Sequence, residues 1–243
     1  MDPKIYKEIV EQEESHWWFR ARRSIVRSLL QRINLPKNAN ILEAGCGGGG
    51  NLGLLAEYGN VYAFEIEDSV RSHAKTRAIG EIATGSLPNQ IPFDDTRFDL
   101  VTMFDVLEHI DDDRASLIAL KKRMNPNGVL LLTVPAFQRL YSQHDIMHHH
   151  KRRYSKIQLK ELIASTGLRL EFISYWNCLL FPIAALVRLA VKLGLIKNNT
   201  YGSKQPPGWV NNALCGLVTS EKYIMKFAGL PFGLSLIAVA RNR

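Results

Sequence analysis

Ile41-Leu42-Glu43-Ala44-Gly45-Cys46-Gly47-Gly48-Gly49-Gly50 is the stretch that decides the fold of this 243-residue chain. Ile41 and Leu42 are expected to end a buried strand, and the glycines to form a turn that opens a helix over 50–57. Glycine adopts positive φ and lets a backbone approach a ligand closely. A strand, a glycine turn and a helix in this order predict a nucleotide-sized site at the carboxyl end of a parallel sheet.

The glycine spacing leaves the ligand open. The first, third and sixth positions of the run from Gly45 to Gly50 also satisfy G-x-G-x-x-G, the dinucleotide-binding pattern. Glu43, two residues before this run, favours a ligand that carries an ammonium group over a pyrophosphate. Residues 60–65 predict a second strand ending in Glu65, where a carboxylate can accept hydrogen bonds from ribose hydroxyls. Glu65 therefore supports a nucleoside ligand without choosing between the cofactors.

The order E-x-G-x-G-x-G resembles the first motif of class I S-adenosylmethionine-dependent methyltransferases. Segments 85–87 with 91–93, and then 98–109, resemble motifs of the same family after its third strand and along its fourth, and 128–135 is similar to its fifth strand. The resemblance implies S-adenosylmethionine as cofactor. It also implies a Rossmann-like, doubly wound α/β sheet with strand order 3-2-1-4-5-7-6 and strand 7 antiparallel.

The resemblance implies a set of cofactor contacts. Glu43 would face the amino acid portion, Glu65 would hold the ribose and Ile66 would cover the adenine. The remaining implied contacts are Gly45, Cys46, Gly47 and Gly49 in the turn, Ser86 and Leu87 near the adenine, and Phe104 and Asp105 after the fourth strand. Many members carry an acid where this chain has Ser86, so adenine recognition is expected to rest on nearby backbone groups. A short-chain dehydrogenase would carry Tyr-x-x-x-Lys, and no tyrosine here has a lysine four residues later.

Two regions are candidates for chemistry on the acceptor. His109 follows the fourth strand, and His144, Asp145 and His150 follow the fifth. We predict that these groups transfer a proton or orient the acceptor, with structural hydrogen bonding as the alternative. Asp105, Glu108 and His109 also resemble a divalent-cation site proposed for quinone-ring O-methyltransferases. Because Mg²⁺ prefers oxygen ligands and successive histidines point in different directions, no metal is predicted.

Further segments resemble a bacterial methyltransferase subfamily of glycan and natural-product pathways, of types 11 and 23. They are His-Trp-Trp-Phe at 16–19, His-x-Arg-Arg-Tyr at 150–154 and the closing segment 231–235. The resemblance implies an acceptor site bordered by Trp18, Arg152, Arg153 and Tyr154. The arginines would grip a phosphate or carboxylate, or form surface charge at a helix start, and Trp18 would line the pocket or pack in the core.

The predicted reaction is methyl transfer to a small molecule, at an oxygen of a sugar-, lipid- or polyketide-like compound. The alternatives are an NAD-dependent oxidoreductase and a non-catalytic nucleoside-binding or membrane-associated protein. The three cysteines lack metal-ligand spacing and are expected to be reduced thiols in the cytoplasm. The polar, acidic N-terminus does not resemble a secretory signal.

Positive charge is concentrated in the last third of the chain. Residues 1–150 hold 17 Lys and Arg against 20 Asp and Glu, whereas residues 151–243 hold 14 against 3. This asymmetry indicates an anionic acceptor or a membrane surface, with a solvated basic surface as the alternative. Nucleic acid is not expected, because aromatic residues do not alternate with the basic ones in a stacking pattern.

We predict one methyltransferase domain, with an N-terminal helical lid over 1–37, a core over 38–176 and 231–243, and a helical insertion over 177–230. The apolar run in the insertion is shorter than the roughly 20 residues of a membrane span. With Arg188 and Lys192 on one face, it either lies in a membrane interface through 179–197, at the inner face of the membrane, or caps the acceptor site. The expected strands are 39–44, 60–65, 81–84, 97–104, 127–134, 168–175 and 234–240, and the expected helices of the core are 50–57, 68–77, 113–124 and 156–166.

Overall fold

The computed structural model describes residues 3–192, 194 and 205–243. Two features expected from the sequence lie outside this description. They are the relative placement of the Arg188 and Lys192 side chains and the polar turn that contains Asn198, Asn199 and Gly202.

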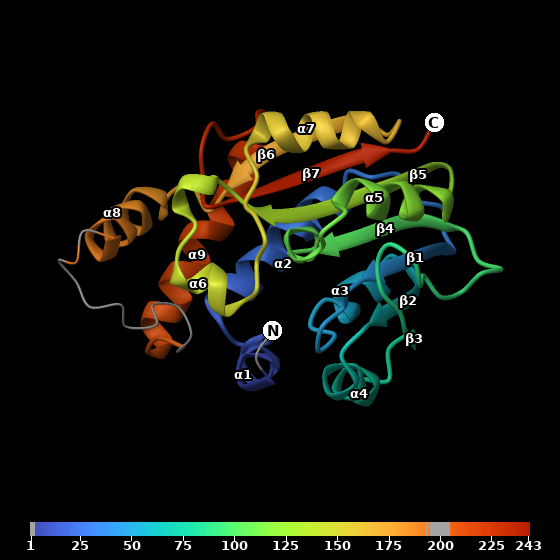
Figure 1. Cartoon of the computed structure of the whole chain (residues 1–243), viewed down its shortest axis with the longest axis horizontal. Coiled ribbons are helices and arrows are strands. Elements are labelled where there is room, and N and C mark those ends of the chain that lie inside the picture. Colours follow the sequence, from blue (N-terminus) through green and yellow to red (C-terminus); the bar gives the residue numbers. More distant parts are fainter. Residues whose placement is uncertain (1–2, 193, 195–204) are drawn as a thin grey trace.

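The described chain folds around a seven-stranded sheet with strand order β3-β2-β1-β4-β5-β7-β6 (Figure 1). β7 runs antiparallel to both of its neighbours, and the other neighbouring strands pair in parallel. The strands are β1 (Ala39–Ala44), β2 (Gly59–Glu65), β3 (Glu81–Thr84), β4 (Phe98–Phe104), β5 (Met124–Pro135), β6 (Arg169–Trp176) and β7 (Ser235–Arg241). The Rossmann-like α/β fold, its strand order and the antiparallel seventh strand are thus confirmed.

The helices alternate with the parallel strands, as right-handed crossover connections require. They are α1 (Pro3–Gln12), α2 (Trp17–Leu30), α3 (Leu52–Ala56), α4 (Asp68–Thr76), α5 (Asp113–Lys122), α6 (Gln143–Met147), α7 (Lys156–Ser165), α8 (Phe181–Lys192) and α9 (Gly208–Met225), with 3-10 turns η1 (Leu107–His109) and η2 (Gln138–Leu140). α6 was not expected from the sequence. It is a single turn held by a capping box between Ser142 and Asp145, too short to show a helical apolar period.

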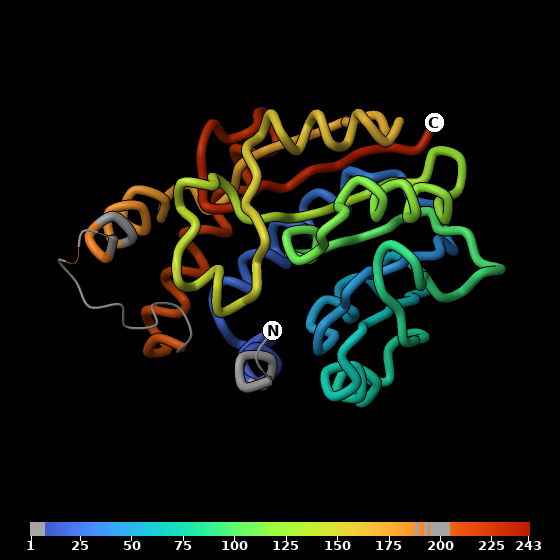
Figure 2. The backbone as a smooth tube through the Cα atoms, viewed as in Figure 1, coloured from blue at the N-terminus to red at the C-terminus, as the bar shows by residue number. Residues whose placement is uncertain are grey.

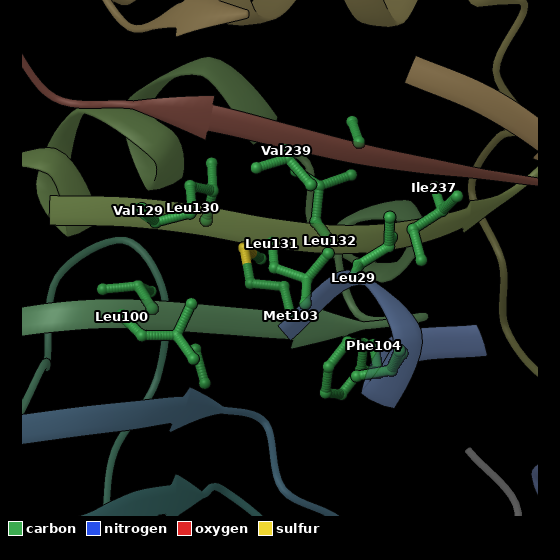
Figure 3. Close-up of a cluster of buried hydrophobic side chains, with 14 of the residues drawn as sticks. Leu29, Leu100, Met103, Phe104, Val129, Leu130, Leu131, Leu132, Ile237 and Val239 are labelled. Carbon is green, nitrogen blue, oxygen red and sulfur yellow. The ribbon is translucent and has the colours of Figure 1, made fainter. Parts of the chain in front are cut away.

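The core lies between the central strands and the helices on the two faces of the sheet. Leu100 and Met103 of β4 and Leu131 and Leu132 of β5 are fully buried, as expected for parallel strands covered on both faces. Figure 3 shows these side chains packed together with Leu29 of α2. The carboxyl ends of β4 and β5 point toward α6 and the N-terminal helices (Figure 1), and this edge of the sheet carries the candidate site.

α8 and α9 separate β6 from β7 along the chain. α8 lies on the outside of the molecule, at the end away from α3 and α4 (Figure 2), and α9 packs along α2. None of the helices in the described parts of the chain combines the length and apolarity needed to cross a membrane. The division of the chain into lid, core and insertion stays a prediction.

Candidate functional site

The glycine turn after β1 combines close packing with open space at one residue. Gly45, Gly47 and Gly49 have φ of +74°, +55° and +84°, a region that side chains other than glycine rarely adopt. A Cβ on Gly45 would lie 2.8 Å from a methyl carbon of Val106, so this glycine allows the turn to pack against the loop after β4. A Cβ on Gly47 would meet no atom within 4 Å. The backbone at Gly47 therefore faces open space.

Glu65, at the end of β2, lies beside this turn. One carboxylate oxygen accepts the amide hydrogen of Gly47 at 3.0 Å, and the other accepts those of Ile66 at 2.8 Å and Glu67 at 3.1 Å. A carboxylate has about four acceptor positions, so Glu65 keeps capacity for a further donor. The neighbouring Ile66 side chain is 65% exposed, as an apolar side chain that covers a ligand in the bound state would be.

Glu43, in β1, has an unfilled hydrogen-bonding position. It is 1% exposed, and one carboxylate oxygen accepts from the side-chain amide of Asn51 at 2.8 Å. The other oxygen is buried without a hydrogen-bond partner among the described residues. Burial raises the pKa of Glu43 to about 8. Asn51 was missed by the sequence analysis, although its position directly after the glycine run placed it at the site.

Asp105, which follows β4 with φ +58°, is held by an arginine from the N-terminal region. Its carboxylate accepts from Arg22 at 2.5 Å and from the Thr133 hydroxyl at 2.9 Å. The Arg22 guanidinium lies 4.7 Å from the ring centroid of Trp18, and the Trp18 ring lies 5.6 Å from that of Trp176. The sequence analysis missed Arg22, although its spacing of four residues from Trp18 puts both on one face of α2.

A second arginine attaches the N-terminal segment to the glycine turn. Arg77 donates to the Gly48 carbonyl at 2.6 Å and forms ion pairs with Glu13 and Glu14. Glu13 is 5% exposed, and a Cβ on Gly48 would lie 2.6 Å from its carboxylate. The segment after α1 therefore lies directly against the turn.

The other residues expected to contact the cofactor are Cys46, Ser86, Leu87 and Phe104. The structure shows their contacts within the protein. Burial raises the pKa of the Cys46 thiol. The Ser86 amide donates to the Gln90 carbonyl at 2.8 Å, and Leu87 packs against the core. Phe104 is 6% exposed, with the Arg22 guanidinium 5.5 Å from its ring centroid. Their contacts with a cofactor stay predictions.

The loop after β5 brings an acid and a histidine together. Asp145 is fully buried, and one of its oxygens lies 2.9 Å from Nδ1 of His150 and 2.7 Å from Nε of Arg153. Burial would raise the pKa of Asp145, but the hydrogen bond from His150 and the charge of Arg153 hold it well below its usual range. Because an ionised carboxylate only accepts hydrogen bonds, Nδ1 of His150 carries the hydrogen. In the neutral ring, Nε2 is then the acceptor.

Two further titratable groups surround Nε2 of His150. A carboxylate oxygen of Glu108 lies 3.9 Å away, and the His109 ring centroid is 4.7 Å from that of His150. Glu108 is fully buried with both oxygens unpartnered among the described residues, and burial and the charge of Asp105 raise its pKa. Burial and the charges of His150 and His148 lower the pKa of His109 to about 3. His109 is therefore a weak base at neutral pH.

The same three side chains could hold a metal ion. One ligand atom each from Glu108, His109 and His150 lie within 4.8 Å of one another. The resemblance to quinone-ring O-methyltransferases pointed instead to Asp105, Glu108 and His109. The described structure pairs Asp105 with Arg22, and it brings His150 to the other two residues.

The remaining expected acceptor residues contact protein groups. Arg152 donates to Asp113 at 3.0 Å, and the Tyr154 hydroxyl donates to the same carboxylate at 2.8 Å. Arg153 is 5% exposed and also donates to a backbone carbonyl at 3.1 Å. The His144 ring lies 4.2 Å from that of His148. Binding of an acceptor by these side chains stays a prediction.

A family model described as a methyltransferase domain matches residues 17–172. The chain belongs to this methyltransferase domain family. The chain is 26% identical over 162 residues to a Mycolicibacterium smegmatis protein named "Probable S-adenosylmethionine-dependent methyltransferase". The match covers 65% of this chain and 62% of the length of that protein. S-adenosylmethionine is therefore the cofactor of the domain, which decides between the two cofactors that the glycine spacing left open.

Two further similarities bear on this methyltransferase. It is 30% identical over 122 residues to the mitochondrial ubiquinone biosynthesis O-methyltransferase of Schizosaccharomyces pombe, covering 46% of the chain and 43% of that protein. It shares its fold with the methyltransferase solved in complex with the Haloferax volcanii Trm112 methyltransferase activator, at a TM-score of 0.64 and 16% identity, covering 99% of this chain and 95% of that one.

We expect the affinity for S-adenosylhomocysteine to rise with pH up to about 8. An ammonium group on the ligand needs the ionised form of Glu43, whose pKa of about 8 keeps it protonated in the free protein at lower pH. Binding then releases a proton, and affinity increases by up to about tenfold per pH unit. Calorimetric titration in buffers of different ionisation enthalpy measures both effects, and the Glu43→Gln variant should lose the pH dependence.

The same group makes the free protein less stable as pH rises. The pKa of Glu43 is raised from an ordinary 4.5 to about 8, so the folded state binds more protons than the unfolded state between these values. Its contribution to stability is therefore present below about pH 4.5 and is lost as pH rises through about 8. The rise in Tm caused by S-adenosylhomocysteine should be larger at pH 8 than at pH 6. Equal affinity at both values would contradict the role of Glu43.

Proposed function

We propose that this methyltransferase transfers a methyl group from S-adenosylmethionine to a hydroxyl oxygen of a sugar-, lipid- or polyketide-like small molecule. The observation that carries the proposal is the pair of Asp145 and His150, 2.9 Å apart. It presents a ring nitrogen as proton acceptor at the same edge of the sheet as the glycine turn. The name of the S. pombe relative, an O-methyltransferase, supports oxygen as the acceptor atom.

The residues at the glycine turn fit the cofactor. The unpartnered oxygen of Glu43 matches an ammonium group, the spare acceptor capacity of Glu65 matches ribose hydroxyls, and the open space at Gly47 admits the ligand. When bound, S-adenosylmethionine supplies an electrophilic methyl group on its sulfonium sulfur. Arg22, 7% exposed, lies close enough to lower the pKa of Glu43 through its positive charge, and its guanidinium suits the carboxylate of the cofactor.

The remaining task of the protein is to position the acceptor and remove its proton. Holding two reactants in line can supply about 7–11 kcal/mol without covalent participation by the protein. We assign the proton transfer to Nε2 of His150, which accepts the hydroxyl hydrogen. Asp145 holds the ring in the required tautomer and stabilises the imidazolium that forms. His109, with its lowered pKa of about 3, is assigned a packing role beside His150.

The charge distribution supports an anionic acceptor. Residues 151–243 carry 14 basic and 3 acidic residues. Arg152, near the start of this range, is half-buried. A phosphate or carboxylate on the acceptor would compete with Asp113 for the guanidinium of Arg152. We also propose that the protein lies in the cytoplasm, with a peripheral contact to the inner face of the membrane through residues 179–197.

A labelled-methyl assay tests the proposal. The whole chain is incubated with methyl-tritiated S-adenosylmethionine and hydroxylated acceptors of three classes: nucleotide-linked sugars, hydroxylated lipids and phenols. A methyl ether product, formed equally with and without EDTA, is the expected result. A product methylated at nitrogen or carbon would overturn the choice of oxygen.

Two further outcomes are informative. Loss of activity with EDTA, restored by a divalent metal, would make Glu108, His109 and His150 metal ligands instead of base and neighbours. Binding of S-adenosylhomocysteine without turnover of any acceptor would favour the non-catalytic alternative. Titration with NAD is the control, and no heat of binding is expected from it.

A further inference from the structure

The outward face of α9 carries large exposed apolar side chains. Trp209 is 77% exposed, Leu217 42% and Ile224 53%, and Phe227, two residues beyond the helix, is 91% exposed. These positions recur at helical spacing and therefore share one face. Ala213, Gly216 and Ser220, which lie between them on that face, are small and also exposed. A solvent-exposed apolar face of this length marks an interaction site.

The inward face of the same helix is fixed to the protein. Asn211 accepts the Trp17 amide hydrogen and donates to the Ser15 carbonyl, both at 2.8 Å. Glu221 is fully buried and accepts the amide hydrogens of Cys178 at 2.7 Å and Leu179 at 2.9 Å. α9 is thus anchored to the start of α2 and to the loop after β6. Its apolar face cannot turn inward without breaking these bonds.

The charge of the insertion that contains α9 favours an anionic partner. Residues 177–230 contain six Lys and Arg, and their single acidic residue is the buried Glu221. The insertion therefore exposes no carboxylate. Lys222 and Lys226 lie within the same stretch as the exposed Tyr223 and Ile224. Exposed apolar and aromatic side chains in an insertion that carries cations and no exposed carboxylate match an anionic lipid surface, which attracts each nearby Lys or Arg by about 1 kcal/mol.

We propose that α9 binds the surface of an anionic membrane through Trp209, Leu217, Ile224 and Phe227. A second copy of this chain fits the same face less well, because it would bring together two insertions that each carry six Lys and Arg against one acidic residue. From the sequence, residues 179–197 were expected either to contact a membrane or to cap the acceptor site. The described structure adds the long face of α9. Leu179, before α8, and Ile183 and Leu186 of α8 are exposed as well. The proposal rests on this surface and not on the identity of the methyl acceptor.

Vesicle sedimentation tests the proposal with the full chain. The protein is mixed with vesicles of phosphatidylcholine alone or of phosphatidylcholine with phosphatidylglycerol. We expect binding to the anionic vesicles only, weakened by salt. The W209A/F227A double variant should bind at least about tenfold more weakly, because two large apolar side chains no longer enter the interface. Ile157→Ala, which removes an equally exposed apolar side chain on α7, is the matched control and should bind like the wild type.

Fluorescence gives a readout at the proposed surface. Of the four tryptophans, Trp209 is by far the most exposed, so anionic vesicles should shift its emission to the blue, and the Trp209→Phe variant should lose that shift. Retained S-adenosylhomocysteine binding and an unchanged far-UV circular dichroism spectrum show that the variants are folded. Equal binding of wild type and double variant, or equal binding to neutral vesicles, would overturn the proposal. A dimer in solution that the double variant abolishes would also overturn it, in favour of a second copy.

Discussion

Replacing His150 with alanine should lower kcat by about 10²–10⁴-fold while S-adenosylhomocysteine binds as in the wild type. The imidazole is the group that we propose removes the proton, and its Nδ1 lies 2.9 Å from a carboxylate oxygen of Asp145. The cofactor residues at the glycine turn belong to other elements, so their binding function should survive. Single-turnover kinetics with the identified acceptor and calorimetry with S-adenosylhomocysteine measure the two quantities separately.

A neighbouring histidine provides the control for this variant. His149 is exposed and has φ +56°, so His149→Asn keeps a residue type that tolerates this backbone. It should leave kcat unchanged. Added imidazole should restore part of the activity of His150→Ala, which a purely structural defect would not allow. A wild-type kcat in His150→Ala would show that another group removes the proton.

Gly47→Arg should abolish binding of S-adenosylhomocysteine, raising Kd by at least about 100-fold, or about 2.8 kcal/mol. A Cβ at this position meets no protein atom within 4 Å, so the new side chain enters the space assigned to the cofactor instead of the core. The backbone φ of +55° adds strain. Isothermal titration calorimetry of the wild type and the variant measures the loss.

Gly53→Arg is the matched control. Gly53 lies on an exposed position of α3, and a Cβ there would come no closer than 3.9 Å to a side-chain carbon of Ile79. The same arginine is thus placed six residues away without blocking the turn. It should bind S-adenosylhomocysteine like the wild type. Tight binding by Gly47→Arg would place the cofactor elsewhere and remove the basis for the roles of Glu43 and Glu65.

The N-terminal helices connect the three functional regions. Arg77 fastens the segment after α1 to the glycine turn, Arg22 of α2 pairs with Asp105, and Asn211 attaches α9 to the residues before α2. A membrane contact at α9 would therefore act on α2, which borders the proposed cofactor site.

Local patterns in the sequence predicted the strands and the glycine turn, and the family resemblance predicted the strand order, which is confirmed. The strands expected at 97–104 and 127–134 are present as β4 and β5. The glycine run predicted a turn, and Gly45, Gly47 and Gly49 have positive φ. Such features depend on a few neighbouring residues, since φ preferences and apolar period are local properties. The antiparallel seventh strand followed from the family resemblance.

Only the tertiary structure decided how the polar groups pair. Arg22 and Asp105 are 83 residues apart in the chain, and no local pattern links them. His150 lies within reach of Asp145 because the single-turn helix α6 brings them together, and Glu108 joins them from another loop. Arg152 and Arg153, expected from the sequence either to bind an anion or to form surface charge at a helix start, contact Asp113 and Asp145. These contacts depend on the relative placement of distant segments, which packing of the whole core sets and which short-range sequence patterns do not encode.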